Sequence, residues 1–480
     1  MNAPILKLFA VVLVLFGALA GMTSYNSVIK AKDYRDNALN KRPQIEQALV
    51  KRGVIRARDG SLLARSTKGA DGIYRRRYTA EAQRFSHVLG YDYGLTIGRA
   101  GLERSDNDAL AGENGELNSI VDDLSGKRKV GDNVITNLDL GAQQVALDAL
   151  GGRRGSVVAI EPKTGKVRVM ASTPSYDPNS LRDAKVFGRL NRENNSPLFN
   201  RATQAGYAPG STMKVVTAAA ALDSGKYTPD SMVSGKSPIT VSGVPLKNFS
   251  DEQFGTITLT TALTHSVNTV WAPIAEQLGH DTMNDYMKRF GFGSDPPLDY
   301  PDGQMFASGV YDLKKEALIP ASSDRVDIGR VGIGQERLRV TPLQMAEVAA
   351  TVANGGRRMK PQLTSRIVDQ DGRTVKRIKP AEVERVMSAG SAEQLTQMMA
   401  NVVKEGTGTA ASLQGIEVAG KTGTAELNIA QRLNQPWFIG FAPRQNPRIA
   451  VAVTLENIVG GQGGVVAAPI AKQVMEALLR

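Results

Sequence analysis

The sequence predicts an α+β protein: an antiparallel sheet flanked by helices, a smaller amino-terminal extension and one amino-terminal membrane helix. Three observations support this class. β-Rich runs stand at both ends of a long carboxyl-terminal region, at 155–172 and 437–456. Helical patterns fill the interval between these runs, and an uncharged apolar segment stands near the amino terminus. Strands that lie far apart in sequence, with helices between them, are typical of α+β domains.

The apolar segment runs from Leu8 to Met22 without a charge. With Ile5 and Leu6 it reaches the roughly 17 residues that a short membrane span needs. We expect residues 1–24 to form a cytoplasmic tip and an uncleaved anchor. A cleaved signal peptide is the alternative, because Ala18 and Ala20 form a small-x-small cleavage pattern. Either interpretation places the rest of the chain outside the cytoplasm.

Residues 25–150 are charged and rich in turn residues, and we expect a small non-catalytic domain there. Asp59-Gly60 predicts a hairpin turn within the run 52–66. The run 137–152 has an Asn/Asp start, helical apolar spacing and a double-glycine end, which together predict a helix joining two domains.

Residues 151–480 are expected to form the second domain. The segment 162–165 predicts a turn between two antiparallel strands. Thr341 suits a helix cap, Pro342 the first helical position and Gly355 the helix end. Two buried strands at 437–442 and 449–456 and a last helix from about 469 to 479 complete the region.

Composition excludes several function classes. The chain has no cysteine, and its three histidines are scattered, so we expect no metal site, no cofactor and no histidine-based triad. The net charge of +12 and the run YRRRY at 74–78 invite a nucleic-acid interpretation. The basic residues are spread along the chain without a nucleic-acid module, so we expect no nucleic-acid partner and favour a basic surface near a membrane or an anionic polymer.

A Ser-x-x-Lys motif, Ser211 and Lys214, opens an Ala-rich apolar helix. Helix periodicity places the two side chains on one face. A serine at a helix start lies where backbone N–H groups favour negative charge, and a lysine desolvated against Val215 and Ala218 could act as its base. The motif alone is weak, since Ser27 and Lys30 fit it too.

Two further motifs follow Ser211 in the order that a serine transpeptidase requires. They are Ser266-Val267-Asn268 and Lys421-Thr422-Gly423-Thr424. A literal Ser-Asp-Asn at 105–107 and a literal Lys-Thr-Gly at 163–165 both precede Ser211, so we interpret them as coincidental.

With these motifs the chain resembles a class B penicillin-binding protein, a membrane-anchored peptidoglycan D,D-transpeptidase. The runs 52–66 and 101–103 resemble the amino-terminal boxes of this class, and GIGQ at 332–335 resembles another of its motifs. The departure is Val267, where the motif described for class A β-lactamases has aspartate. The resemblance implies a penicillin-binding and serine β-lactamase-like fold for residues 151–480.

The resemblance also implies site roles. Ser211 attacks the carbonyl between the last two D-alanines of a stem peptide, Lys214 takes its proton, and Ser266 relays that proton toward the leaving amine. Asn268 binds the donor peptide. Lys421, expected as an exposed ammonium beside the hydroxyls of Thr422 and Thr424, binds the terminal carboxylate, while Gly423 lets the substrate approach. The backbone N–H groups of Ser211 and Thr424 form an oxyanion hole.

The implied partners are peptidoglycan stem peptides, β-lactam antibiotics, the cell membrane and a polytopic glycosyltransferase. A D,D-carboxypeptidase with the same motifs stays open as an alternative. A β-lactamase is disfavoured, because no Glu-x-x-Leu-Asn stretch follows the motifs. A non-catalytic β-lactam-binding activator of a glycosyltransferase is the alternative from another class. The acceptor amine and a role in elongation or division are not encoded in these motifs.

Overall fold

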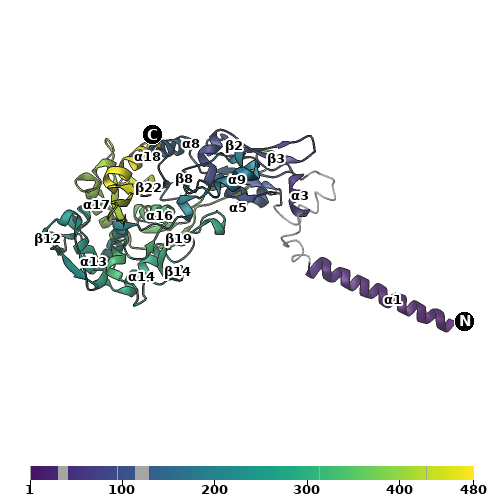
Figure 1. Cartoon of the computed structure of the whole chain (residues 1–480), viewed down its shortest axis with the longest axis horizontal. Helices are drawn as coiled ribbons and strands as arrows, with labels where there is room; N and C mark the ends of the chain where they lie inside the picture. The colour runs from purple at the N-terminus through teal and green to yellow at the C-terminus, as the bar shows by residue number, and fades with distance from the viewer. Residues whose placement is uncertain (1, 31–41, 95, 114–128, 313, 429) are drawn as a thin grey trace.

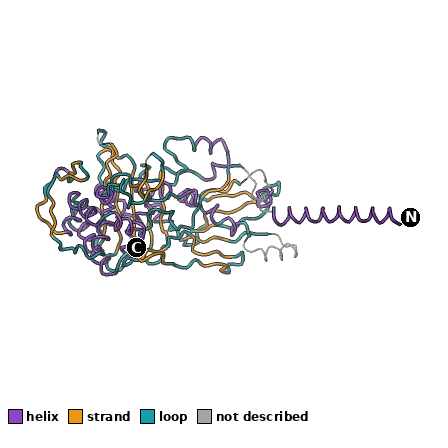
Figure 2. Tube along the Cα trace, turned by 90° about the horizontal axis from the view of Figure 1, so that it is seen from below, coloured by secondary structure: helices purple, strands orange, loops and turns teal. Residues whose placement is uncertain are grey.

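The computed structural model of the chain describes residues 2–30, 42–94, 96–113, 129–312, 314–428 and 430–480. A long helix, α1 (Asn2–Ser24), stands apart from the rest of the protein (Figures 1 and 2). It continues through a π-helical turn at Tyr25–Ile29. The amino-terminal strands lie between α1 and the helix-rich body, and the chain ends on the body beside α8 (Figure 1).

Helix α1 is apolar and its side chains are exposed. The stretch Ala3–Ile29 is long and apolar enough to cross a membrane, and none of it is buried in the protein. Side chains such as Leu8 and Phe16 are about two-thirds exposed, at 66% and 67%. A continuous apolar surface of this kind requires an apolar environment, so the predicted membrane helix agrees with the structure.

A six-stranded antiparallel sheet forms the centre of the carboxyl-terminal region, with the short strand β23 (Ile458–Val459) paired to β21 off the main order. Its order is β20-β21-β22-β7-β8, with strands at Ala419–Asn428, Leu433–Ala442, Ile449–Leu455, Gly155–Ile160 and Val167–Thr173. β22 pairs with β7 in register from Leu455↔Gly155 to Ala450↔Ile160. The first strands of the region are therefore joined to the last, as the sequence predicts.

Helices cover both faces of this sheet, and the alternating side chains of β22 explain why. Ile449, Val451 and Val453 belong to the core beneath α8 (Leu140–Leu150) and α18 (Ala468–Leu479). Ala450 and Ala452 belong to the larger core on the other face. Successive residues of a strand point to opposite faces, so a fully buried strand needs apolar side chains at every position.

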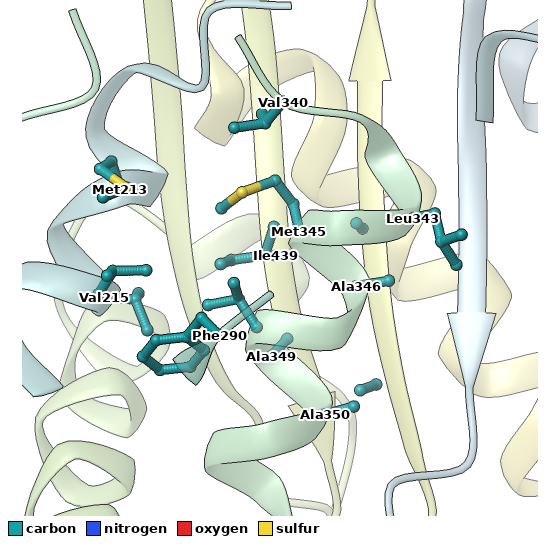
Figure 3. Close-up of a cluster of buried hydrophobic side chains, with 14 of the residues drawn as sticks. Met213, Val215, Phe290, Val340, Leu343, Met345, Ala346, Ala349, Ala350 and Ile439 are labelled. Atoms are coloured by element: carbon teal, nitrogen blue, oxygen red, sulfur yellow. The ribbon is translucent and has the colours of Figure 1, made fainter. Parts of the chain in front are cut away.

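The larger core is organised around α16 (Pro342–Ala353), which is buried along almost its whole length. Figure 3 shows Met345 of α16 and Ile439 of β21 next to Met213 and Val215, which flank Lys214. The oxygen of Thr341 accepts the N–H of Gln344 and caps α16, as predicted. The segment that carries Ser211 and Lys214 therefore packs against the larger buried core.

The remaining helices of this face include α11 (Lys214–Asp223), α12 (Leu259–Thr264), α13 (Asn268–Leu278), α14 (His280–Arg289) and α17 (Ala389–Lys404). Helix α17 lies against β20 and also against α11 and α12. The short strands β9 (Met232–Gly235) and β12 (Phe254–Thr258) pair beside α13. These helices bring three distant sequence motifs to one edge of the sheet.

A second, six-stranded sheet has the order β18-β17-β6-β1-β2-β3. Its strands are Thr374–Arg377, Thr364–Val368, Asn133–Thr136, Ile55–Arg56, Leu62–Lys68 and Tyr74–Tyr78. The hairpin predicted at Asp59-Gly60 joins β1 to β2. Two strands come from beyond residue 360, which the sequence does not indicate. A domain division near residue 150 remains a prediction.

The two amino-terminal boxes meet in a buried ion-pair cluster. Glu103 is fully buried and contacts Arg52 Nη2 at 3.1 Å, Arg76 Nε, and the hydroxyl of Tyr78 at 3.3 Å. Arg76 Nη1 also donates to the carbonyl of Gly53 at 2.6 Å. Pairing and hydrogen bonds together make the burial of these charges tolerable.

We expect Glu103→Gln to lower the free energy of unfolding by about 3–5 kcal/mol, because it leaves the buried guanidinium of Arg76 without its carboxylate. Denaturant unfolding of the full chain in neutral detergent measures this loss. Asp108→Asn is the matched control, since Asp108 is an exposed acid in the next helical turn, α6 (Asn107–Leu110). An equal effect of the two substitutions would contradict the role given to Glu103.

Candidate active site

Ser211 lies in a tight turn between the core and strand β20. It belongs to a 3-10 helix, Gly210–Met213, which continues as α11 from Lys214. The sequence predicts that an α-helix starts at Ser211, but the structure has one turn of 3-10 helix there and the α-helix starts at Lys214. Gly210 has a φ of +53°, and a Cβ there would meet the carbonyl oxygen of Thr424 at 2.8 Å. Only glycine permits this close approach of the turn to β20.

Several contacts hold the segment before Ser211 in place. Gly210 N–H donates to the carbonyl of Gly334 at 3.0 Å, and Gly334 belongs to the GIGQ motif. The indole N–H of Trp437 donates to the carbonyl of Ala208 at 3.0 Å. The hydroxyl of Tyr207 donates to Glu456. The serine thus stands on a backbone tied to the sheet and to the loop before α16.

Lys214 is completely buried, and its ammonium nitrogen contacts three oxygens. Nζ lies 2.6 Å from the carbonyl oxygen of Ser266, 3.2 Å from Ser266 Oγ and 2.7 Å from Asn268 Oδ1. Burial, and then the positive charge of Lys421, lower the pKa of Lys214 well below its usual value. Both causes disfavour the charged form, so the site favours an amine that can accept a proton.

Lys421 approaches the same hydroxyl from β20. Its Nζ lies 2.9 Å from Ser266 Oγ and 2.9 Å from the carbonyl of Thr422. Burial lowers the pKa of Lys421 to about 7. The expectation of an exposed ammonium is wrong, because this lysine has no exposed surface. The segment carrying Ser266 covers it, which the sequence around Lys421 does not reveal.

Ser266 therefore lies between two lysines, and its backbone is strained to put it there. Its φ of +60° falls in the left-handed region, which a residue with a side chain adopts rarely. Such conformations cluster at functional sites. Asn268 begins α13, and its side-chain N–H donates to the carbonyl of Lys247 at 3.1 Å, which orients Oδ1 toward Lys214.

The remaining predicted residues lie along β20. Thr422 Oγ1 is 2.6 Å from Thr407 Oγ1, and Thr424 Oγ1 accepts the N–H of Gly463 at 3.2 Å. A Cβ on Gly423 would meet the carbonyl oxygen of Pro209 at 2.8 Å. Glycine is therefore required at position 423 by the close packing of the Ser211 turn, in addition to the expected approach of substrate.

One predicted contact is not present. Among the residues that the structure describes, the hydrogen bonds of Lys214 Nζ go to Ser266 and Asn268, and none joins it to Ser211 Oγ. The structure does bring Lys214, Ser266, Asn268 and Lys421 together. Sequence reasoning missed Thr407 and Gly463, since neither stands in a recognisable motif. The described residues contain no group of acidic or histidine side chains that could hold a metal ion.

The motif-like segments interpreted as coincidental lie elsewhere. Gly165 closes the turn between β7 and β8 with its N–H on the carbonyl of Glu161. Asp106 accepts the hydroxyl of Thr364, beside the six-stranded sheet. Ser27 lies on the exposed apolar helix. Ser211 instead stands in a turn packed on an antiparallel strand, near two buried lysines that share a second serine, and this arrangement suits serine acyl transfer.

Comparison with known proteins identifies the class further. Residues 155–476 match the penicillin binding protein transpeptidase domain, and residues 52–134 match the penicillin binding protein A dimerisation domain. The chain belongs to the penicillin-binding protein transpeptidase family.

Similar proteins cover nearly the whole chain. Peptidoglycan D,D-transpeptidase PbpA of Mycolicibacterium smegmatis is 34% identical over 505 residues, which cover 100% of this chain and 99% of that protein. The structure of penicillin-binding protein A from M. tuberculosis as a ceftriaxone acyl-enzyme is 32% identical, with a TM-score of 0.81 over 91% of this chain and 100% of that one. Peptidoglycan D,D-transpeptidase MrdA of Acinetobacter baumannii is 30% identical over 83% of this chain and 65% of its own length. The family predicted from the motifs is confirmed.

Proposed function

We infer that this chain is a peptidoglycan D,D-transpeptidase, a serine enzyme that cross-links stem peptides through an acyl-enzyme and is inhibited by β-lactams. The observation that carries this function is the buried Lys214, hydrogen-bonded to Ser266 and Asn268 one turn after Ser211. It occurs in a chain 34% identical to a named peptidoglycan D,D-transpeptidase over its full length. The residue roles below are our proposal.

Acylation begins at Ser211. Its Oγ attacks the carbonyl carbon of the penultimate D-alanine, and its proton passes to the neutral amine of Lys214. The hydroxyl of Ser266 relays a proton to the leaving nitrogen, since it contacts Nζ of both lysines. The peptide C–N bond breaks, the last D-alanine leaves as a free amine, and the rest of the donor peptide remains as an ester on Ser211.

The donor peptide binds along β20. The hydroxyls of Thr422 and Thr424 bind the terminal carboxylate, and the buried ammonium of Lys421, held against Ser266, supplies the positive charge that favours this anion. The carbonyl oxygen takes hydrogen bonds from the backbone N–H groups of Ser211 and Thr424. A Cβ added at Gly210 would lie 2.8 Å from the carbonyl oxygen of Thr424, so the two backbone segments are adjacent, which supports this pairing. Losing one such donor typically costs about 3–4 kcal/mol in the transition state.

The second half-reaction forms the cross-link. An amine of another stem peptide attacks the ester carbonyl and passes a proton to Lys214, and Ser211 regains its proton as the leaving group. A β-lactam acylates Ser211 by the same first step, but its ring opens without releasing a leaving group from the site. The adduct therefore blocks the position that the acceptor amine needs.

The chain is proposed as a single-pass protein of the bacterial cell membrane, with its catalytic domain outside the cytoplasm. The exposed apolar helix Ala3–Ile29 supports an anchor. A peptidoglycan substrate lies outside the cytoplasm and supports this orientation. We further propose that residues 25–150 form a non-catalytic domain that engages a polytopic glycosyltransferase, and that 151–480 form the catalytic domain.

The full chain in detergent, given a pentapeptide donor ending in D-Ala–D-Ala and an amine acceptor, tests this function. We expect cross-linked product, with one D-alanine released for each bond formed. Mass spectrometry separates the cross-linked peptide from a trimmed one. Trimmed tetrapeptide alone, at acceptor concentrations that saturate related enzymes, would indicate a D,D-carboxypeptidase, and β-lactam binding without either product would indicate a non-catalytic activator.

A further inference from the structure

A cavity of about 200 Å³ lies in the amino-terminal part of the protein, apart from the active site. It is open to solvent and is lined by residues of β3, of β4 (Tyr91–Tyr93) and of the end of α3 (Arg42–Ala48). We call it the arginine cavity, because the residues that line it include Arg52, Arg75, Arg76, Arg99 and Arg182. None of the proposed catalytic residues lines it.

One guanidinium in this lining has an unused donor. Arg76 is 3% exposed, and its Nε and Nη1 are occupied by Glu103 and by the carbonyl of Gly53. Its Nη2 has no hydrogen-bond partner among the described residues. A buried donor attached to a charged group is costly to leave unpaired. The atom itself has almost no accessible surface, so it adds positive charge beside the cavity and does not itself form part of the cavity surface.

The cavity also has an excess of positive charge. Asp92 is the one carboxylate in its lining, and it is shared by Arg52 and Arg99, at 2.8 Å from each. Arg75 pairs with Asp71, outside the cavity. Arg182 lines the cavity, is exposed, and has no ion-pair partner among the described residues. Even when Glu103 and Asp71 are counted, the arginines outnumber the acids.

We propose that the arginine cavity binds a phosphate group. The arginines around it come from three separate elements: Arg75 and Arg76 from β3, Arg99 from β5 (Gly98–Ala100), and Arg182 from the 3-10 helix Pro178–Arg182. Donors that converge from different directions suit a tetrahedral oxyanion, and guanidinium groups bind phosphate with paired hydrogen bonds. The volume of about 200 Å³ exceeds what a single carboxylate fills.

Two sources of phosphate fit this site. One is free inorganic phosphate, and the other is the phosphodiester of an anionic membrane lipid. Helix α3, which lines the cavity through Gln47 and Ala48, is the first described element after the apolar amino-terminal helix and its π-helical turn, so a lipid headgroup is a candidate source.

Thermal unfolding of the full chain in maltoside detergent, which has no phosphate, tests this site. We expect inorganic phosphate to raise the melting temperature more than chloride does at the same ionic strength. The increase should level off as the phosphate concentration rises, as binding to a site requires. Arg182→Ala should weaken the apparent affinity at least about tenfold, because one charge-assisted contact is lost. Arg189→Ala is the matched control, since Arg189 is an exposed arginine of the following helix, α9 (Ala184–Leu190), that does not line the cavity.

Arg182→Glu should abolish the phosphate response, while the melting temperature in chloride alone reports whether each variant is folded. Titration with a short-chain phosphatidylglycerol distinguishes the lipid source from free phosphate, because the apparent affinities of the two ligands can be compared. A diacylglycerol without phosphate is the control lipid. Absence of any phosphate response beyond chloride in the parent chain would overturn the proposal. An equal loss in Arg182→Ala and Arg189→Ala would overturn it as well.

Discussion

We expect Ser211→Ala to abolish covalent labelling by penicillin and to lower the rate of peptide cross-linking by a factor on the order of 10⁶, as loss of the serine does in other acyl-transfer enzymes. In the proposed mechanism the ester forms on this oxygen. The methyl group that replaces the hydroxyl leaves the 3-10 turn and the contact of Gly210 with Gly334 intact. A labelled penicillin, followed on a gel and by the mass of the intact chain, measures the loss.

Ser27→Ala is the matched control, because Ser27 and Lys30 have the same spacing. Ser27 lies on the exposed apolar helix, where its hydroxyl donates to the carbonyl of Thr23. Labelling of this variant should equal that of the parent chain. Label retained by Ser211→Ala would refute the assignment of the nucleophile. Rapid release of the label from the parent would instead indicate β-lactamase activity.

The contrast between these two serines shows what the sequence could predict. The spacing is identical, but only Ser211 is followed by the motifs at 266–268 and 421–424. Three motifs in a fixed order predict a shared site, because each supplies one group of a known mechanism. The contacts of Lys214 and Lys421 with Ser266 agree with that prediction. The caps of α8 and α16 were also encoded locally, by Asp139 and Thr341.

Features that depend on distant packing were not predictable. Lys421 stands in a stretch with no unusual apolar flank, and its burial arises only when the Ser266 segment folds over β20. The pairing of β17 with β6 joins residues more than 200 positions apart. Thr407 reaches Thr422 from the loop after α17. Periodicity and turn signals are local, so they carry no information about which distant segments meet.

The second large effect concerns Lys214. We expect Lys214→Ala to lower the acylation rate by about 10²–10⁴, the usual contribution of a general base. Lys214→Arg should be as slow, because a guanidinium keeps its proton at neutral pH. Stopped-flow acylation by a chromogenic β-lactam measures both rates. Lys226→Ala is the control, because Lys226 lies just beyond the same helix and is exposed.

The pH dependence of acylation separates a base from a merely structural lysine. Lys214 must be neutral to accept the proton of Ser211, so kcat/KM rises as pH increases through its lowered pKa. Lys421 must be charged to bind the carboxylate of the β-lactam, so kcat/KM falls as pH rises through the Lys421 pKa of about 7. The plot of kcat/KM against pH is therefore bell-shaped. Because Lys214 and Lys421 interact, its two apparent pKa values are properties of the pair.

Lys421→Met tests this coupling, since methionine keeps much of the volume and removes the charge. The positive charge of Lys421 is the second cause that lowers the pKa of Lys214, after burial. Removing it should raise the pKa of Lys214, so the acid limb moves to higher pH while the alkaline limb at about 7 disappears. An acid limb that stays in place would show that Lys214 is not the group that titrates. A different result is a kcat/KM for the variant that is lower than that of the parent chain by the same factor at every pH. That result would indicate that Lys421 acts only in binding and that Lys214 has only a packing role.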